Sequence, residues 1–182
     1  MKSLILILCV FFSIQLSFAQ NDTIVSNDDV ILVVPTQSDT ISTGSEVTME
    51  MATQFLAHHN MARNEVGVPD LKWSANLASI AQKHADMLAQ DHCSFRHSGN
   101  STIGENLYGG GGTVFTALDA SKSWYKEKDN YTYSNSKYNH YTQMVWKSTT
   151  EVGVGVAQCE DGFYIFVANY APVGNMLGSY PY

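Results

Sequence analysis

An alternation of valine and glycine near the C-terminal end constrains this 182-residue chain more than any other feature. Val152, Val154 and Val156 are separated by single glycines, and a period of two with β-branched residues predicts a strand with one buried face. An Asp-Gly pair at 161–162 separates this run from a second apolar run at 163–170. Asp-Gly between two such runs is a strong signal for a tight turn, so we expect a β-hairpin.

A polar segment with one histidine leads into this hairpin. His140 and Gln143 are followed directly by Val145 and Trp146. We therefore expect His140 to lie on a short helix or turn just before a core strand. A rigid scaffold behind the imidazole would hold it in one direction, as a binding or catalytic residue requires.

The first 19 residues have the pattern of a secretory signal peptide. Lys2 gives a positive start, the stretch 4–12 is apolar, and a Ser-Phe-Ala sequence at 17–19 provides a small-residue cleavage site. This apolar stretch is too short to span a bilayer, and we expect no transmembrane segment elsewhere. The sequence therefore predicts a secreted, extracellular product that begins at about Gln20.

Loss of this leader would leave an acidic chain with two cysteines. The whole chain has ten basic residues, one of them Lys2 of the leader, against 17 acidic residues. Without a basic patch to contact phosphate backbones, nucleic acid is excluded as a partner. Cys9 leaves with the leader, and Cys93 and Cys159 remain. An oxidising compartment permits a disulfide between them.

Residues 20–47 are acidic and rich in Ser and Thr, which predicts an arm or linker. Within this segment, 30–34 is a strand-like apolar run that ends at Pro35. We expect a mostly disordered spacer, with a strand added to the domain or to a partner as the alternative. The folded domain is expected to span 48–182.

Three helices are expected before the hairpin. Apolar residues at helical spacing predict helices over 55–66 and 73–88, the second capped by Ser74. A third helix is expected to begin with Thr113 as its cap. A polar segment, 91–112, lies between the last two. Its glycine-rich part, 104–112, is expected to bend sharply, and it lacks the Gly-Lys-Ser/Thr ending of a phosphate-binding loop.

Several segments, in order, resemble the CAP superfamily, which comprises cysteine-rich secretory proteins, insect venom antigen 5 and plant pathogenesis-related class 1 proteins. The resemblance covers residues 50–182. The matching segments are 55–73, His97 with the Gly-Glu-Asn-Leu sequence at 104–107, the Trp-x-x-Glu element at 124–127, and two signatures at 140–155 and 168–175. His59 and Arg63 match the first segment, and we expect His59 to be a hydrogen-bonded core residue.

The resemblance implies an α+β fold, a three-layer α/β/α sandwich with a central, mainly antiparallel sheet (the CAP or SCP fold). The order of elements supports α+β by itself but does not fix the layers. The chain departs from plant relatives in having fewer cysteines, because Val154 and Ala168 stand where relatives often have cysteine. In addition, Asn139 replaces the glycine that usually precedes the central histidine.

The resemblance also implies one cleft formed by two histidines and two carboxylates, where relatives can hold zinc or another divalent cation. These residues are His97, His140, Glu105 and Glu127. Imidazole nitrogen and carboxylate oxygen are ordinary zinc donors. If only the histidines ligate, the glutamates would orient them or hold a water. The alternative is a hydrogen-bonded polar cluster without a metal.

Three functions remain open. Tyr131, Tyr133 and Tyr138 lie in a loop that helps to bind sterol in fungal relatives, which predicts a non-enzymatic module for a small apolar ligand, a sterol or fatty acid. These tyrosines would otherwise pack on the sheet. A metal-dependent hydrolase or protease using the same cleft is the second function, although no His-Glu-x-x-His or Gly-x-Ser-x-Gly motif supports it and no catalytic residue is predicted. A secreted effector that acts through protein contacts is the third.

Overall fold

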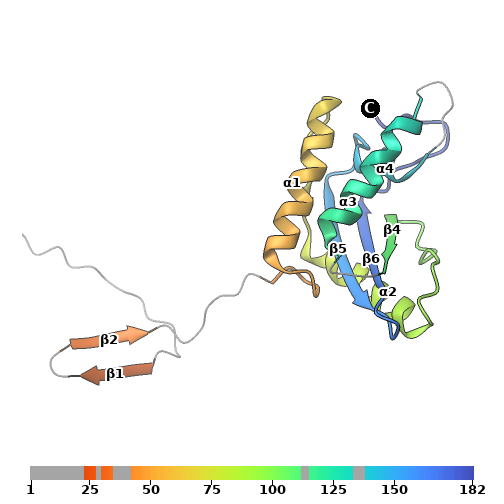
Figure 1. Cartoon of the computed structure of the whole chain (residues 1–182). Coiled ribbons are helices and arrows are strands. Elements are labelled where there is room, and N and C mark those ends of the chain that lie inside the picture. The colour runs from red at the N-terminus through yellow and green to blue at the C-terminus, as the bar shows by residue number, and fades with distance from the viewer. Residues whose placement is uncertain (1–22, 28–29, 35–41, 112–114, 133–137) are drawn as a thin grey trace, which may run out of the picture. The chain divides into compact units, whose positions relative to one another are not determined.

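The computed structural model describes residues 23–27, 30–34, 42–111, 115–132 and 138–182 (Figure 1). These fall into two compact units, and Ser42–Tyr182 is the larger. In the smaller unit, β1 (Thr23–Asn27) pairs with β2 (Val30–Val34) as an antiparallel hairpin. The apolar run in the arm is therefore a strand, and its partner is the neighbouring segment 23–27. Among the described residues, no helix has the length and apolar character to cross a bilayer.

A four-stranded sheet in the order β3-β5-β6-β4 forms the centre of the larger unit. The predicted hairpin is confirmed: β5 (Glu151–Gln158) and β6 (Tyr164–Ala171) pair antiparallel. On one side β4 (Gly104–Gly110) extends the sheet antiparallel to β6, and on the other β3 (Lys72–Trp73) adds a short parallel pair with β5. The sheet is mainly antiparallel, as expected.

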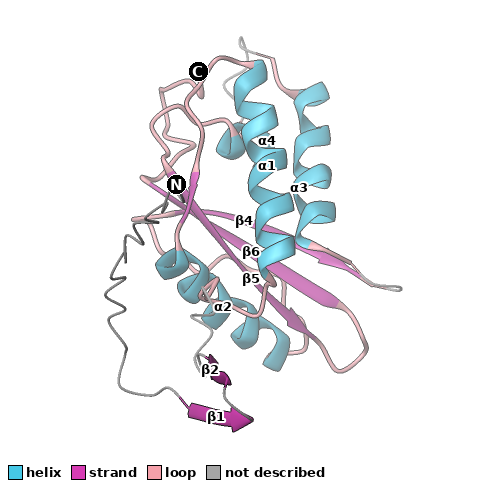
Figure 2. Cartoon of the chain, turned by 90° about the vertical axis from the view of Figure 1, so that its left-hand side faces the viewer, coloured by secondary structure: helices cyan, strands magenta, loops and turns pink. Residues whose placement is uncertain are grey.

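Helices cover both faces of this sheet, which gives the expected three-layer α/β/α arrangement. Figure 2 shows α1 (Met49–Glu65) and α3 (Ala117–Lys126) over one face and α2 (Ala75–Gln90) under the other. A short helix, α4 (His140–Met144), precedes β5, and a 3-10 turn, η1 (Glu127–Asn130), follows α3. The expected short helix at His140 is therefore confirmed.

The glycines of β5 explain why this strand is buried on both faces and not on one. Val152 and Val154 pack into the cluster under α1 and α3, with Phe55 and Trp124. The glycines between them point toward α2, where a Cβ on Gly153 would overlap the backbone nitrogen of Ala78. Glycine therefore lets the α2 backbone lie directly on the sheet.

The helix caps agree with the sequence analysis at Ser74 and differ from it at Thr113. Ser74 caps α2 through its side-chain oxygen, as expected, and Thr48, which was not predicted as a cap, caps α1 in the same way. The expected cap at Thr113 is wrong, because α3 begins at Ala117 with Thr116 as its N-cap. The helix begins after Thr116 because Asp119, three residues further on, forms a reciprocal capping box with it. Thr113 itself lies outside the described residues.

The glycine-rich segment contains a strand that the sequence analysis did not predict. Residues 104–110 form β4. At two of its glycines, the space that a side chain would fill is occupied by an aromatic ring from another part of the chain. A Cβ on Gly109 would lie 2.8 Å from the Phe163 ring, and one on Gly110 would lie 3.0 Å from Phe115. Glycine here marks close ring packing, so residues 104–110 do not form the sharp bend that their composition predicted.

Candidate functional site: a histidine and glutamate cleft

Four different elements supply the four predicted cleft residues. His97 lies in the loop after α2, and Glu105 is the second residue of β4. Glu127 opens η1 at the end of α3, and His140 is the first residue of α4. Sheet pairing fixes Glu105 opposite Asn169 of β6. The site is therefore assembled by the tertiary fold and not by one local motif.

His97 and Glu105 form the first pair. The Nδ1 atom of His97 lies 2.8 Å from Glu105 Oε1, and the same oxygen accepts a hydrogen bond from the Ser98 backbone N–H at 2.9 Å. The two side chains differ in exposure, since His97 is 63% exposed and Glu105 only 7%. A buried carboxylate thus anchors an imidazole that extends into solvent.

His140 and Glu127 form the second pair. Glu127 accepts from the His140 backbone N–H at 2.8 Å and from ring Nδ1 at 2.7 Å. The His140 ring also stacks on Trp124, with centroids 6.0 Å apart and an angle of 26° between planes. Trp124 is itself held by a hydrogen bond from its Nε1 to Leu107 O. The imidazole is therefore fixed in position on two sides.

Both pairs open onto one cleft with a volume of ≈ 590 Å³. Its lining is polar apart from one tyrosine ring. The residues that line it are His97, Glu105, Asn106, Glu127, Asn130, Tyr138, Asn139, His140 and Asn175.

Three asparagines that were not predicted as site residues hold α4 in place. Asn139 caps the helix, and its Nδ2 donates to Glu127 O, which ties α4 to η1. Asn175 donates to Asn139 O and accepts from Thr142 Oγ1. Asn106 donates to the backbone oxygen of His140 at 3.1 Å. The substitution of Asn139 for the usual glycine therefore adds an anchor beside His140.

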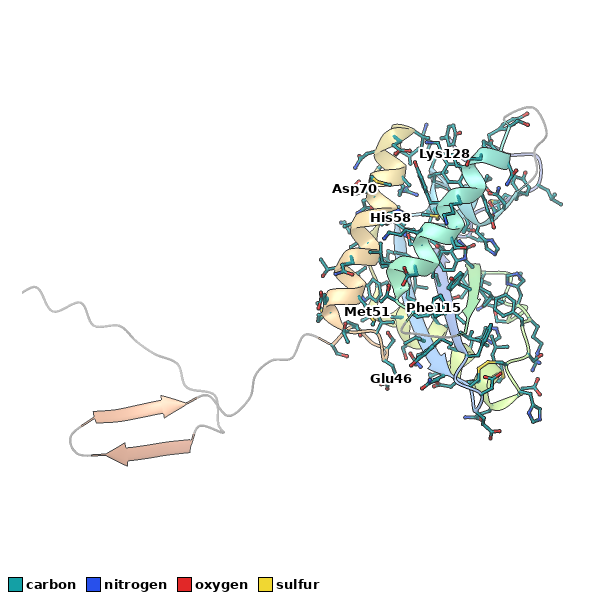
Figure 3. The ribbon with its side chains drawn as sticks, in the orientation of Figure 1. Glu46, Met51, His58, Asp70, Phe115 and Lys128 are labelled. Atoms are coloured by element: carbon teal, nitrogen blue, oxygen red, sulfur yellow. A yellow bond between two sulfur atoms is a disulfide. The ribbon has the colours of Figure 1, made fainter. Side chains whose placement is uncertain are left out.

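His59 and Arg63 are structural residues of the core, as expected for His59. Burial lowers the pKa of His59 to about 3, so the ring is neutral. Its Nδ1 donates to Phe55 O, and its Nε2 accepts from Tyr170 O–H at 2.8 Å. His58, labelled in Figure 3, lies on the same helix and contacts α3. Among the described residues, the acceptors of the buried Arg63 guanidinium are backbone oxygens, including that of Met144 in α4.

The predicted loop tyrosines are only partly described, because Tyr133 lies outside the described residues. Tyr131 packs against the buried Tyr141 and against Tyr182. Tyr138 packs on Trp146, and its hydroxyl donates to the backbone oxygens of the C-terminal segment. These two rings therefore join the loop to the domain and to the end of the chain.

Cys93 and Cys159 form a disulfide, with Cα atoms 6.0 Å apart (Figure 3). This separation lies in the ordinary range for disulfides. The bond joins the loop after α2 to the end of β5. The same loop carries His97, so the covalent link lies four residues from the first histidine of the cleft.

The chemistry of the cleft fits a divalent cation held mainly by imidazole. Each Nδ1 is occupied by a glutamate, and within the described residues neither Nε2 has a hydrogen-bond partner. A ring held at Nδ1 by a carboxylate is the usual arrangement of a histidine that binds metal through Nε2. No three His, Cys, Asp or Glu side chains of the described residues converge closely enough to hold a metal as they stand. Two imidazoles and water would therefore have to supply the ligands.

Comparison with known proteins gives the family. A profile of the cysteine-rich secretory protein family, CAP, matches residues 56–170. Pathogenesis-related leaf protein 6 of Solanum lycopersicum is 44% identical over 134 residues, which cover 70% of this chain and 81% of that protein. Pathogenesis-related protein 1C of Nicotiana tabacum is 40% identical over 134 residues, covering 70% and 79%. The chain therefore belongs to the CAP family. Within this family, its domain is of the pathogenesis-related class 1 type.

Solved structures agree on the fold. A crystal structure of NaASP2 with Zn2+ superposes with a TM-score of 0.61 at 23% identity, covering 75% of this chain and 86% of that chain. The hookworm platelet inhibitor superposes with a TM-score of 0.63 at 23% identity, covering 76% and 78%. At this level of identity the likeness establishes the CAP fold alone.

Proposed function

We propose that this protein is a secreted, non-enzymatic binding module whose cleft holds a divalent cation through Nε2 of His97 and Nε2 of His140. The observation that carries the proposal is the matched pair of Nδ1 contacts, at 2.8 Å to Glu105 and 2.7 Å to Glu127. Each contact fixes the tautomer and the ring direction, and leaves the other nitrogen lone pair for a metal. Bound zinc would supply a Lewis acid in the cleft.

The hydrogen bonds of the two glutamate carboxylates support a binding function over hydrolysis. A general base must have an oxygen within reach of the water whose proton it removes. Both oxygens of Glu127 accept from His140, and Glu105 Oε1 accepts from His97 and Ser98. The remaining oxygen, Glu105 Oε2, is buried. The glutamate oxygens are therefore engaged in orienting the histidines and are not positioned to take a proton from a water.

Export is part of the same proposal. Residues 1–19 lie outside the described residues, so the signal peptide stays a prediction from the sequence. The relatives support it, since one of them, 44% identical over 142 residues, is named secreted protein RBT4 of Candida albicans. This chain covers 37% of RBT4, and the likeness concerns the shared domain.

Zinc titration by calorimetry tests the proposal, because NaASP2 was crystallised with that ion. The wild type is expected to bind one equivalent, and His97→Ala and His140→Ala should each remove most of the affinity. His92→Asn is the matched control, since His92 is an exposed histidine that does not line the cleft. Equal zinc affinity in the wild type and His140→Ala would reject the assignment. Zinc-dependent peptide cleavage that is lost in Glu105→Gln would favour the hydrolase function instead.

An apolar ligand is a second candidate, favoured by one surface feature. Met176, Leu177 and Tyr180 are 51%, 93% and 49% exposed, respectively, in the C-terminal segment that the Tyr138 hydroxyl contacts. Exposed apolar side chains grouped in this way are candidates for a lipid contact. Binding of radiolabelled sterol and fatty acid by the wild type and by Leu177→Ser would test it. No binding of either ligand to the wild type would end this second function.

A further inference from the structure

A third histidine, His84, lies behind the cleft among the buried residues of α2. His84 is 5% exposed and faces the loop that carries His97. We propose that His84 is a positioning residue of the cleft: it holds the His97–Glu105 pair in place from behind. The expected effect of His84 on zinc affinity rests on the proposed function. Its effect on the His97 ring in the metal-free protein does not, and can be measured separately.

The first contact is with the loop backbone. His84 Nε2 lies 3.0 Å from the backbone oxygen of Arg96, the residue directly before His97. A carbonyl oxygen can only accept, so Nε2 carries the proton and donates. On the other side of His97, the Ser98 N–H donates to Glu105. The backbone is therefore fixed on both sides of His97, once by α2 and once by β4.

The second relationship is with Glu105 itself. Its Oε2 is buried without a hydrogen-bond partner among the described residues, and it lies 4.0 Å from the same His84 Nε2. This distance is too long for a hydrogen bond, but the N–H dipole still favours the carboxylate at close range. The buried Oε2 thus lies near an N–H group that also holds the loop. Replacing the ring would free both the loop and the carboxylate.

The position of His97 explains why such support is needed. At 63% exposed, the His97 side chain has little packing of its own, and within the part of the chain that the structure describes its ring is bonded to Glu105 alone. His140, in contrast, is held by Glu127 and by stacking on Trp124. The His97 half of the cleft is therefore the half that depends on a residue behind it.

Two kinds of variant separate positioning from folding. His84→Phe keeps an aromatic ring and removes the donor, and His84→Ala serves if the larger ring does not fold. His84→Gln keeps an N–H donor at nearly the same reach. Leu88→Ala is the matched control, because Leu88 is a buried core residue one turn further along the same helix. It should lower thermal stability and remove packing beside the loop, since Leu88 shares an apolar cluster with Cys93, but it leaves the bond from His84 to Arg96 O in place.

Calorimetry with zinc on the full secreted chain should show about a tenfold loss of affinity in His84→Phe, as for other groups that orient a ligand. His84→Gln should recover most of that loss, and Leu88→Ala should bind like the wild type. Wild-type affinity in His84→Phe, no recovery in His84→Gln, or an equal loss in Leu88→Ala would overturn the proposal.

A measurement without metal keeps this test independent of the zinc site. In ring ¹H–¹⁵N spectra of the metal-free protein, the Nδ1 resonance of His97 should shift or broaden in His84→Phe, while that of His140 stays unchanged. If the wild type binds no zinc, the proposed function fails, and these spectra still decide the role of His84. An unchanged His97 resonance would overturn the positioning role.

Discussion

Glu127 accepts two hydrogen bonds from His140, one from its backbone N–H at 2.8 Å and one from its ring at 2.7 Å. Glutamine at this position has one acceptor oxygen, and its amide group would face an N–H donor. We expect Glu127→Gln to lower zinc affinity by about 10- to 100-fold, the usual cost of losing a group that orients a metal ligand. Calorimetry on this variant and on Glu160→Gln, in the turn between β5 and β6 away from the cleft, checks the prediction. Equal losses in both variants would contradict it.

Gly153 should be among the least replaceable residues of the sheet. Alanine there would place a Cβ against the α2 backbone at Ala78, and neither backbone can move without shifting a whole layer. We expect Gly153→Ala to lower the free energy of unfolding by about 3 kcal/mol, at the upper end for overpacking. Gly67→Ala is the control, because it has a positive φ but open space around it, and should cost about 1 kcal/mol. Denaturant unfolding that ranks the two variants in reverse would refute the packing explanation.

The disulfide between Cys93 and Cys159 closes a loop with a sequence separation of 66 residues. Chain-entropy bookkeeping for a loop of this length gives about 4 kcal/mol of stabilisation. We expect the double variant Cys93→Ser with Cys159→Ser to lose about this amount in denaturant unfolding. Thiol titration of the unfolded, unreduced protein should find neither cysteine free. Two free thiols would show that the bond is absent from the secreted protein.

Stability should fall in mild acid because of the buried histidine of α1. Burial lowers the pKa of His59 to about 3 in the folded protein, whereas an unfolded histidine titrates near 6.5. Between these values the unfolded state binds one more proton, so the contribution is complete above about pH 6.5 and declines as pH falls. The slope is about 1.4 kcal/mol per pH unit for one proton.

His59→Gln removes this titration and keeps a side chain that can donate and accept. Between pH 7 and pH 5 the wild type should lose about 2 kcal/mol more of its unfolding free energy than the variant. Exposed carboxylates titrate in both proteins and cancel in the difference. Parallel pH profiles for the two proteins would show that His59 is not buried as a neutral ring.

The sequence predicted those parts of the fold that depend on local pattern. The hairpin followed from the alternation around Val154, and the cap at Ser74 followed from a short polar side chain before an apolar run. β4 was missed because its glycines carry no β propensity, and only neighbouring rings such as Phe163 explain them. Val154 and Ala168, where relatives often have cysteine, are cross-strand partners, which no linear spacing reveals.

The cleft was predicted from resemblance, because its residues come from four separate segments between His97 and His140, and linear spacing does not show that they converge. Residues whose role depends on what lies behind them were not predicted. His84 fits the apolar pattern of α2, and only the tertiary contact with Arg96 O distinguishes it from an ordinary core residue. Asn106 belongs to the Gly-Glu-Asn-Leu motif, which could have marked it as a site residue. Its bond to the His140 backbone, however, is visible only in the structure.

Ring nitrogen resonances during a zinc titration test the cation site most directly. In long-range ¹H–¹⁵N spectra of the metal-free protein, both His97 and His140 should show a protonated Nδ1 and a bare Nε2, as their bonds to Glu105 and Glu127 require. Added zinc should shift both Nε2 resonances together and saturate at one equivalent, while both Nδ1 atoms stay protonated. A response from only one ring, a response at Nδ1, or none in excess zinc would contradict a shared site.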